Sequence, residues 1–227
     1  GVIGVPLPKD KARAGVEAAL DAPPCGWEDA ANTIGTTDTF AKGAMAQAVV
    51  DGKTVTLGAF IKGSGMIAPD MATMLGYIFT DAALEPAFLQ RLLSAANLKT
   101  FSCITVDSDT STSDTVLAFA TGKAGNAPLS CFDCAGADAF AAALEDVCRQ
   151  LAQLVVRDGE GAQKFITIEV SGAVSDDSAI VKAILASDEG ALRAAIKENK
   201  DAVSAPTKDG SYPIILATLY GDVEIMK

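Results

Sequence analysis

The sequence predicts an α/β fold, an α+β layered sandwich in which helices cover β-sheets, over residues 1–186. Two observations support this prediction. Segments in which apolar and polar residues alternate are typical of half-buried strands, and segments with apolar residues at helical spacing lie between them. Hydrophobic residues make up 49% of the chain and charged residues 21%, a balance that allows a sizeable core.

The expected elements follow from these patterns and from the Gly- and Pro-rich segments between them. Residues 1–7 are apolar and β-branched, as if the chain began inside a strand. Helical spacing, with Pro8 in a tolerated first-turn position, predicts helices over residues 8–20, 27–32, 84–98, 135–156 and 176–185. Alternation and β-branched content predict strands over residues 53–60, 73–80, 101–106, 115–120 and 165–170.

Residues 187–227 have a different sequence pattern and are expected to form a short helical tail. Residues 209–217, followed by Gly221, resemble one ankyrin repeat, in which a turn glycine precedes a helix start. Tyr212 and Ile215 replace the usual Thr and His of that repeat. Because a single repeat cannot bury its own face, the alternative is a helix-turn-helix tail that packs on the main domain.

Charge and composition exclude several classes of function. The net charge of −11 argues against nucleic acid, because phosphate binding needs clustered Lys and Arg. No apolar run approaches the length of a membrane span. The chain contains no histidine, which removes Ser-His-Asp and Cys-His catalysis and zinc sites that depend on imidazole. Any nucleophile must therefore be activated by another group.

The five cysteines are irregularly spaced, so we expect reduced thiols in a reducing compartment. Cys131 and Cys134 form a C-x-x-C motif. Without a second pair or a histidine, the motif favours a loop before a helix over a zinc or redox site.

Three residues in or beside glycine-rich segments are candidates for chemistry. Lys62 opens a loop that is not a P-loop, and it could bind a carboxylate or remain solvated. Thr73 follows Ala72 where this loop gives way to a strand. In a chain without histidine, threonine can use its own α-amine as a base, provided that the bond before it is cleaved. Glu160 lies between two glycines and could meet an ammonium group or be an exposed turn residue.

Residues 104–115 are dense in Asp, Ser and Thr. Such oxygen ligands suit Ca²⁺ or Mg²⁺, but the EF-hand pattern fails because its glycine and its closing glutamate are missing. These side chains also bond to backbone groups in tight turns. We favour that structural role, and we expect no metal.

Four blocks occur in an order and spacing that resemble the ornithine acetyltransferase (glutamate N-acetyltransferase) family. The specific block is KGSGMIAPDMATML, and it is accompanied by TTDTFAK, TVDSDTSTSDT and VRDGEGAQKFI. The resemblance covers about residues 1–186 and implies a layered fold related to N-terminal-nucleophile enzymes. It also implies self-cleavage between Ala72 and Thr73, followed by acetyl transfer from N-acetylornithine to glutamate through acetyl-Thr73, in arginine biosynthesis.

The resemblance also implies roles for particular residues. Gly1 matches the family's oxyanion-hole glycine, and Lys62 and Glu160 are expected to hold the carboxylate and the amine of the substrate. The matching substrate-binding positions are Thr39, Lys62, Thr73 and Glu160. No dissociable cofactor is needed, although acetyl-CoA is a possible alternative donor. We expect an oligomer of cleaved α and β fragments in the cytoplasm, or in a mitochondrion if the source is eukaryotic.

The sequence departs from the family at both ends. Family members have a long portion before the segment matched by Gly1, and a C-terminal part that adds an Asn and a Ser or Thr to the substrate site. The chain is therefore expected to be a truncated or rearranged relative. Two alternatives to the acetyltransferase stay open: an aminopeptidase or amidase of the same mechanistic class, and an inactive relative that acts as a binding module.

Overall fold

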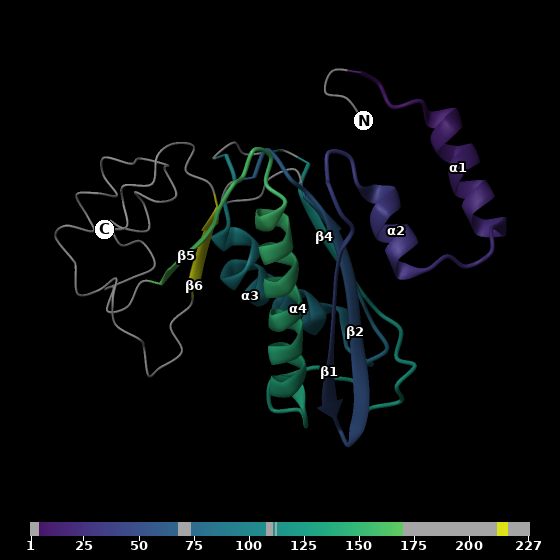
Figure 1. Cartoon of the computed structure of the whole chain (residues 1–227). Helices are drawn as coiled ribbons and strands as arrows, with labels where there is room; N and C mark the ends of the chain where they lie inside the picture. Colours follow the sequence, from purple (N-terminus) through teal and green to yellow (C-terminus); the bar gives the residue numbers. More distant parts are fainter. Residues whose placement is uncertain (1–4, 68–73, 108–110, 112, 170–212, 218–227) are drawn as a thin grey trace.

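The computed structural model describes residues 5–67, 74–107, 111, 113–169 and 213–217 (Figure 1). A four-stranded sheet has the order β1-β2-β3-β4, and the helices α3 and α4 lie against one of its faces. The predicted α/β layering is therefore confirmed. A second, two-stranded sheet pairs β5 with β6.

Strands β1 (Lys42–Val50) and β2 (Lys53–Lys62) form an antiparallel hairpin whose register pairs Val50 with Lys53. Asp51 and Gly52 make the turn with φ of 49° and 70°, the left-handed region that two-residue hairpin turns require. The predicted strand over residues 53–60 is confirmed and extends to Lys62. The prediction missed β1, although Asp-Gly between two apolar segments is a strong hairpin signal.

Strand β3 (Leu75–Thr80) is antiparallel to β2, whereas β4 (Thr115–Ala120) is parallel to β3. Parallel neighbours need a crossover connection, and the segment between these two strands contains α3 (Pro86–Lys99). The strands predicted over residues 73–80 and 115–120 are confirmed, the first of them from Leu75 onward.

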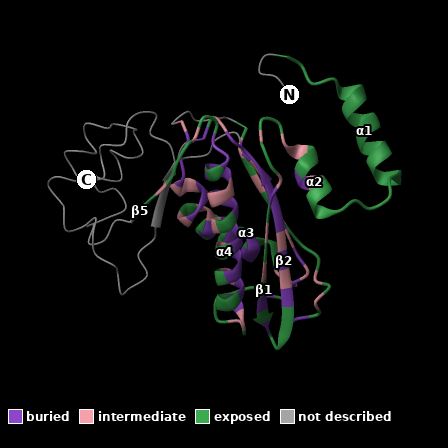
Figure 2. Cartoon of the chain, in the orientation of Figure 1, coloured by how far each residue is buried: buried purple, intermediate pink, exposed green. Residues whose placement is uncertain are grey.

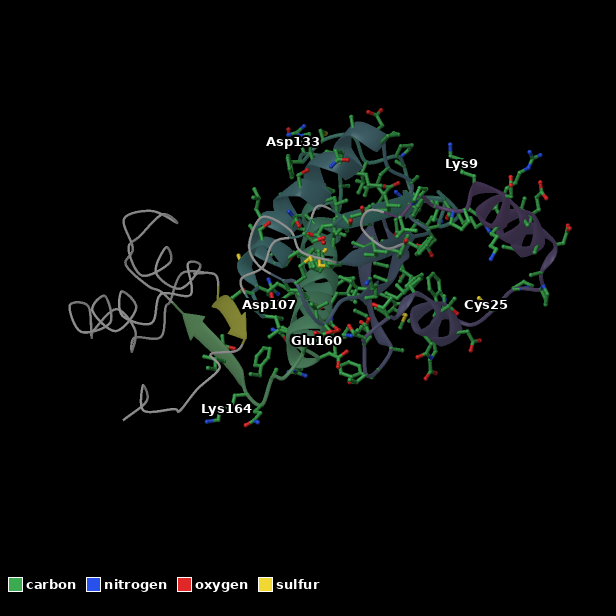
Figure 3. The ribbon with its side chains drawn as sticks, turned by 90° about the horizontal axis from the view of Figure 1, so that it is seen from above. Lys9, Cys25, Asp107, Asp133, Glu160 and Lys164 are labelled. Atoms are coloured by element: carbon green, nitrogen blue, oxygen red, sulfur yellow. The ribbon has the colours of Figure 1, made fainter. Side chains whose placement is uncertain are left out.

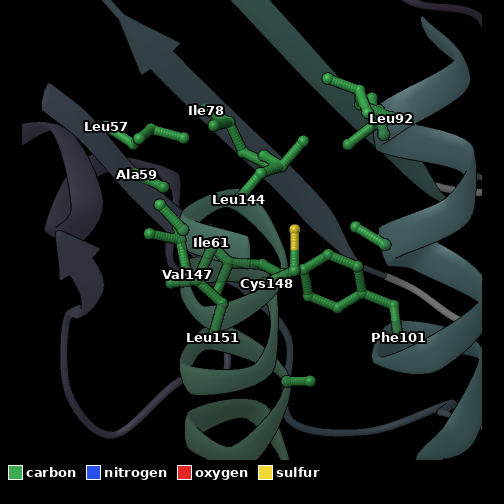
Figure 4. Packing of buried hydrophobic residues seen from close by; sticks show 14 of the residues in the cluster. Leu57, Ala59, Ile61, Ile78, Leu92, Phe101, Leu144, Val147, Cys148 and Leu151 are labelled. Carbon is green, nitrogen blue, oxygen red and sulfur yellow. The ribbon is translucent and has the colours of Figure 1, made fainter. Parts of the chain in front are cut away.

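The core lies between the sheet and the helices α3 and α4 (Ala137–Arg157), as Figure 4 shows. Successive strand residues point to opposite faces, so alternate residues of β2 are buried against the helices. Each large apolar side chain buried there stabilises the fold by about 1.5–3 kcal/mol. The core side chains include Leu57 and Ile61 from β2, Phe88 and Leu92 from α3, and Phe140, Leu144, Val147 and Leu151 from α4.

The opposite face of the sheet carries a row of aromatic rings. Phe79 stacks on Phe60 and Phe119 with ring centroids 6.0 and 5.1 Å apart. Helix α2 (Trp27–Ile34) covers part of this row, and Trp27 contacts Phe79 edge-on at 5.3 Å. Helix α1 (Lys9–Asp21) is exposed along its whole length (Figure 2).

The strand predicted over residues 101–106 is wrong. Phe101–Cys103 forms a 3-10 turn (η1), and residues 104–106 continue without a ladder. Phe101, Ile104 and Val106 are buried by packing, so their apolar and β-branched character reflects the core and not a strand. The described residues 5–7 do not form a strand either.

Strand β5 (Phe165–Glu169) confirms the predicted strand near residue 165 and pairs antiparallel with β6 (Pro213–Ala217). The ankyrin-like interpretation placed a helix start at β6, and that placement is wrong. The segment is a short β-branched run, and its backbone completes a ladder with β5. The helix predicted over residues 176–185 and the boundary between residues 186 and 187 lie outside the described residues.

Candidate active site

Three loops meet at the end of the sheet where β1 begins and β2 ends, at the upper end in Figure 1. They are the loop before β1, the glycine-rich loop after β2 and the loop after α4. Ser64 links all three: its hydroxyl lies 2.7 Å from that of Thr37, and its carbonyl accepts the Glu160 N–H at 2.6 Å. Figure 3 views this end, with Glu160 and Asp107 labelled.

A buried charge cluster lies beneath the loops. The Lys42 side chain is fully buried, and its ammonium group forms ion pairs with Asp38 and Asp158. A buried charge is stable only when it is paired and hydrogen-bonded, so this cluster fixes the relative positions of the loops that carry it. Burial would raise the pKa of Asp38. The Gly63 N–H, the Lys42 ammonium and the Thr36 N–H nevertheless hold the pKa of this carboxyl below its ordinary value.

Thr39, a predicted substrate-binding residue, is bound to this cluster. Its N–H donates to Asp158 Oδ2 at 2.9 Å, and its hydroxyl donates to Asp158 Oδ1. The residue is otherwise exposed and lines a shallow polar depression with Asn32, Thr36 and Phe40. Since the hydroxyl proton is engaged by Asp158, the oxygen can offer its lone pairs to a donor on a ligand.

Lys62, the predicted carboxylate ligand, is the last residue of β2 and is 8% exposed. Its ammonium group donates to Thr36 Oγ1 at 3.1 Å. The lysine is therefore held at the site and is not a solvated turn residue.

Glu160, the predicted amine ligand, leans against the glycine-rich loop. A Cβ added to Gly65 would lie 2.9 Å from the Glu160 carboxyl carbon and from Oε2, so a larger residue at position 65 would displace the end of the Glu160 side chain. Glu160 is exposed, so an ammonium group can reach its carboxylate from solvent. The arrangement supports a role for Glu160 at the site over that of an isolated turn residue.

The aspartates of the Asp/Ser/Thr-rich block bind backbone groups, as expected. Asp107 accepts the N–H groups of Met66 and Ile67, and Asp114 accepts the Met74 N–H at 2.6 Å. These bonds hold the chain on both sides of residues 68–73. Asp114 Oδ2 is buried and has no hydrogen-bond partner among the described residues.

The half-buried position of Asp114 changes its titration. Burial raises the pKa of Asp114 to about 6, although the Met74 N–H and the nearby Lys62 act in the opposite direction. Its carboxyl accepts the N–H of Met74, the residue that follows the predicted nucleophile Thr73 in the sequence.

The structure brings together Thr39, Lys62 and Glu160, whereas Gly1, Ala72 and Thr73 lie outside the described residues. The buried cluster of Asp38, Lys42 and Asp158 was not among the predicted site residues. Asp38 and Lys42 belong to the block TTDTFAK, and Asp158 belongs to the block VRDGEGAQKFI. The sequence signal that could have identified these residues was a charged residue beside an apolar segment in such a block.

The described part of the chain contains no cluster of three or more His, Cys, Asp or Glu residues that could hold a metal ion. None of its helices combines the length and the apolar character needed to cross a membrane.

Comparison with known proteins places the four sequence blocks in a wider match. The model of the ArgJ family matches residues 1–201. The arginine biosynthesis bifunctional protein ArgJ of Zymomonas mobilis is 60% identical over 184 residues, which cover 81% of this chain and 45% of that protein. The ArgJ protein of Ruegeria pomeroyi is 54% identical over 199 residues, covering 86% of this chain and 47% of that protein.

A solved structure, the arginine biosynthesis bifunctional protein ArgJ of Bacillus halodurans, is 33% identical. It aligns with a TM-score of 0.48 over 64% of this chain and 87% of the other. The present chain spans about half the length of the curated relatives it matches.

Proposed function

The chain belongs to the ArgJ family, and on this premise we propose that it carries the nucleophile and substrate-binding loops of an acetyltransferase of arginine biosynthesis. The reaction proposed is acetyl transfer from N-acetylornithine to glutamate through acetyl-Thr73. The supporting observation is that Thr39 and Glu160 lie on two of the three loops joined through Ser64 and the buried Lys42 cluster, and that Lys62 ends the strand from which the third loop leaves. Strand β3 begins two residues after position 73, beside these loops.

Self-cleavage is the proposed first step. The Thr73 hydroxyl attacks the carbonyl carbon of Ala72, the C–N bond breaks, and the nitrogen of Thr73 takes the proton. Water then hydrolyses the resulting ester, which leaves Ala72 with a free carboxylate and Thr73 with a free α-amine. The amine has a pKa of about 7.7–8.0 when unperturbed, so a neutral, basic fraction exists near neutral pH.

Acetyl transfer then follows a ping-pong course. The Thr73 α-amine accepts the hydroxyl proton while the oxygen attacks the acetyl carbonyl of N-acetylornithine. The proton passes to the leaving nitrogen, and ornithine departs. The amine of glutamate then attacks acetyl-Thr73, and N-acetylglutamate leaves as the threonine hydroxyl is restored. The Gly1 N–H is proposed as an oxyanion donor, and in comparable enzymes one such donor contributes about 2.7–4 kcal/mol.

Substrate recognition is proposed to use opposite charges, one at the end of β2 and one on the loop after α4. N-acetylornithine offers a carboxylate and an ammonium group. Lys62 would bind the first and Glu160 the second, while Thr39 would accept from an N–H of the substrate. This assignment accounts for the charged side chains at the site without a metal or a dissociable cofactor. Acetyl-CoA is proposed as an alternative acetyl donor.

The proposed location is the cytoplasm, supported by five free cysteines among the described residues. Assembly is proposed as an oligomer of cleaved α and β fragments.

A denaturing mass spectrum of the purified chain tests the first step. We expect two fragments, the second beginning at Thr73, and a single species in the Thr73→Ala variant. Acetyl transfer from N-acetylornithine to glutamate should be lost in the same variant. Transfer that survives Thr73→Ala would disprove the nucleophile, and turnover unaffected by glutamate would indicate an amidase or aminopeptidase. An intact, inactive wild-type chain would favour a binding module.

A further inference from the structure

We propose that Cys131 and Cys134 form a reversible dithiol–disulfide site that reacts with low-molecular-weight disulfides such as oxidised glutathione. Both thiols are free, and their sulfur atoms are 2.8 Å apart. A disulfide bond is about 2.05 Å long, so a small approach of the sulfurs closes it. The site is separate from the three loops of the candidate active site.

The turn that a C-x-x-C disulfide needs is already present in the dithiol form. The Cys134 N–H donates to the Cys131 carbonyl at 3.3 Å, and the Ala137 N–H donates to the Cys134 carbonyl at 3.0 Å. Because the two residues are held in one turn, closing the ring between them costs little additional chain entropy.

Both ends of this turn are anchored in the core. Before it, Leu129 is buried, and its N–H and carbonyl bond to Ala83 and Glu85 at 3.0 and 2.9 Å. After it, Gly136 has a φ of 85° and lies so close to β1 that an added Cβ would be 2.6 Å from the Val49 carbonyl oxygen. The backbone that carries the two cysteines is therefore held in place at both ends of the turn.

The two thiols are accessible to solvent, and their pKa values differ. Cys131 is exposed and Cys134 is half-buried, just before the first turn of α4. The thiol of Cys131 is the main group that lowers the pKa of Cys134 to about 7, with help from Ser130, and the same contact raises the pKa of Cys131. A thiolate is the attacking form in thiol–disulfide exchange, so Cys134 is the expected attacking residue.

The exchange balances in two steps. The Cys134 thiolate attacks one sulfur of oxidised glutathione, which forms a mixed disulfide and releases one glutathione thiolate. The Cys131 sulfur, losing its proton, then attacks the Cys134 sulfur and releases the second glutathione. Two cysteine thiols are oxidised to one disulfide, while one glutathione disulfide is reduced to two thiols.

Cys25 and Cys148 lack this arrangement. Cys148 is buried in the core, and burial raises the pKa of its thiol to about 12. Cys25 is exposed, and neither it nor Cys148 has a second thiol within hydrogen-bonding distance in the structure. A zinc site is disfavoured at the pair because no third ligand accompanies the thiols within the described residues.

The location keeps this chemistry apart from the proposed active site. Helix α4 has 21 residues and so spans about 30 Å. The dithiol precedes its first residue, whereas Asp158 follows its last. We therefore expect disulfide formation to leave acetyl transfer unchanged, and the two proposals can fail independently.

The test is equilibration of the folded chain in buffers of varied oxidised-to-reduced glutathione ratio, followed by acid quenching, maleimide alkylation and peptide mass spectrometry. We expect the Cys131–Cys134 peptide to lose two hydrogens and to carry neither maleimide nor glutathione, reversibly. Cys131→Ser should leave glutathione on Cys134 as a mixed disulfide, because the thiol that releases it is gone. Cys134→Ser should leave a slowly reacting Cys131.

Cys25→Ser is the matched control, because it removes an exposed thiol and should not change the reaction of the pair. Circular dichroism of each variant verifies that it is folded. The proposal is overturned if the two cysteines end as independent glutathione adducts. It is equally overturned if both cysteines of the wild-type chain are still alkylated by maleimide at the most oxidising glutathione ratio.

Discussion

At the scale of single residues, Lys42 is the side chain on which the site most depends. It is fully buried between two carboxylates, which are themselves at most 6% exposed. Removing one partner of a buried ion pair is costly mainly because it leaves an uncompensated charge behind. Here the loss of one lysine would strand two carboxylates beneath the loops that carry Thr39 and Glu160.

Lys42→Met is therefore expected to lower the free energy of unfolding by about 3–5 kcal/mol. The measurement is urea-induced unfolding followed by circular dichroism. The matched control is Lys53→Met in the same hairpin, where the lysine is exposed and the change should stay within about 0.5 kcal/mol. Equal effects of the two substitutions would contradict the structural role of the cluster.

Asp114 predicts a dependence of stability on pH. Its pKa is raised from 3.8 to about 6 in the folded chain, so the folded state binds a proton more tightly than the unfolded state does. The contribution of the Asp114 carboxyl to the free energy of unfolding is therefore fully present below about pH 4, and it is lost as the pH rises through about 6.

Asp114→Asn keeps an acceptor for the Met74 N–H and removes the buried charge. Above pH 6 the variant is expected to be more stable than the wild type by about 1–2 kcal/mol. This value is smaller than the free energy that corresponds to the whole pKa shift, because solvent screens a side chain that is only partly buried. The difference should vanish near pH 4 in urea unfolding. The exposed Asp133→Asn controls for net charge, and a difference independent of pH would refute the assignment.

At the scale of elements, the junction between the hairpin turn and α4 is held by one glycine. Gly136 combines a positive φ of 85° with contact to backbone, since an added Cβ would lie 2.6 Å from the Val49 carbonyl oxygen and 2.7 Å from the Val50 Cα. Neither atom is the end of a flexible side chain, so the helix or the hairpin has to move.

Gly136→Ala should therefore lower the free energy of unfolding by more than left-handed backbone strain alone would, which costs about 1–3 kcal/mol. Gly125→Ala separates the two causes, because Gly125 has a φ of 71° with no atom within 4 Å of an added Cβ. Thermal unfolding of both variants measures the difference. A loss at Gly136 no larger than that at Gly125 would show that the close approach to β1 has no energetic effect.

At the scale of the whole molecule, the two faces of the main sheet differ in cover. Helices α3 and α4 bury one face, whereas the aromatic face is covered only in part by α2. Leu117 and Phe119 of β4 are 42% and 45% exposed on that face, and Met45 of β1 is 67% exposed. A patch of this kind favours association.

We therefore expect the isolated chain to self-associate in sedimentation velocity, with an average mass that rises with concentration. Leu117→Lys should weaken this association by placing a charge within the patch. Leu98→Lys is the matched control, because Leu98 is also exposed, at 69%, but lies on α3. A stable monomer in the wild type would contradict the expectation.

The sequence alone determined the elements whose periodicity was strong and local. Alternating residues identified β2, and helical spacing identified α3 and α4. The sequence blocks also singled out Thr39, Lys62 and Glu160, because a short motif keeps its spacing whatever the fold around it. The prediction missed β1, since its run of small residues gives little contrast between the two faces.

Only the tertiary structure decided which charged residues are buried together. Lys42 and Asp158 are 116 residues apart, and no local pattern relates them. The same holds for residues 101–106, whose apolar side chains resemble a strand but are buried by packing without a ladder. The periodicity of apolar residues shows which side of an element is buried. It does not show which distant segments come together, because that depends on how all the elements of the fold pack.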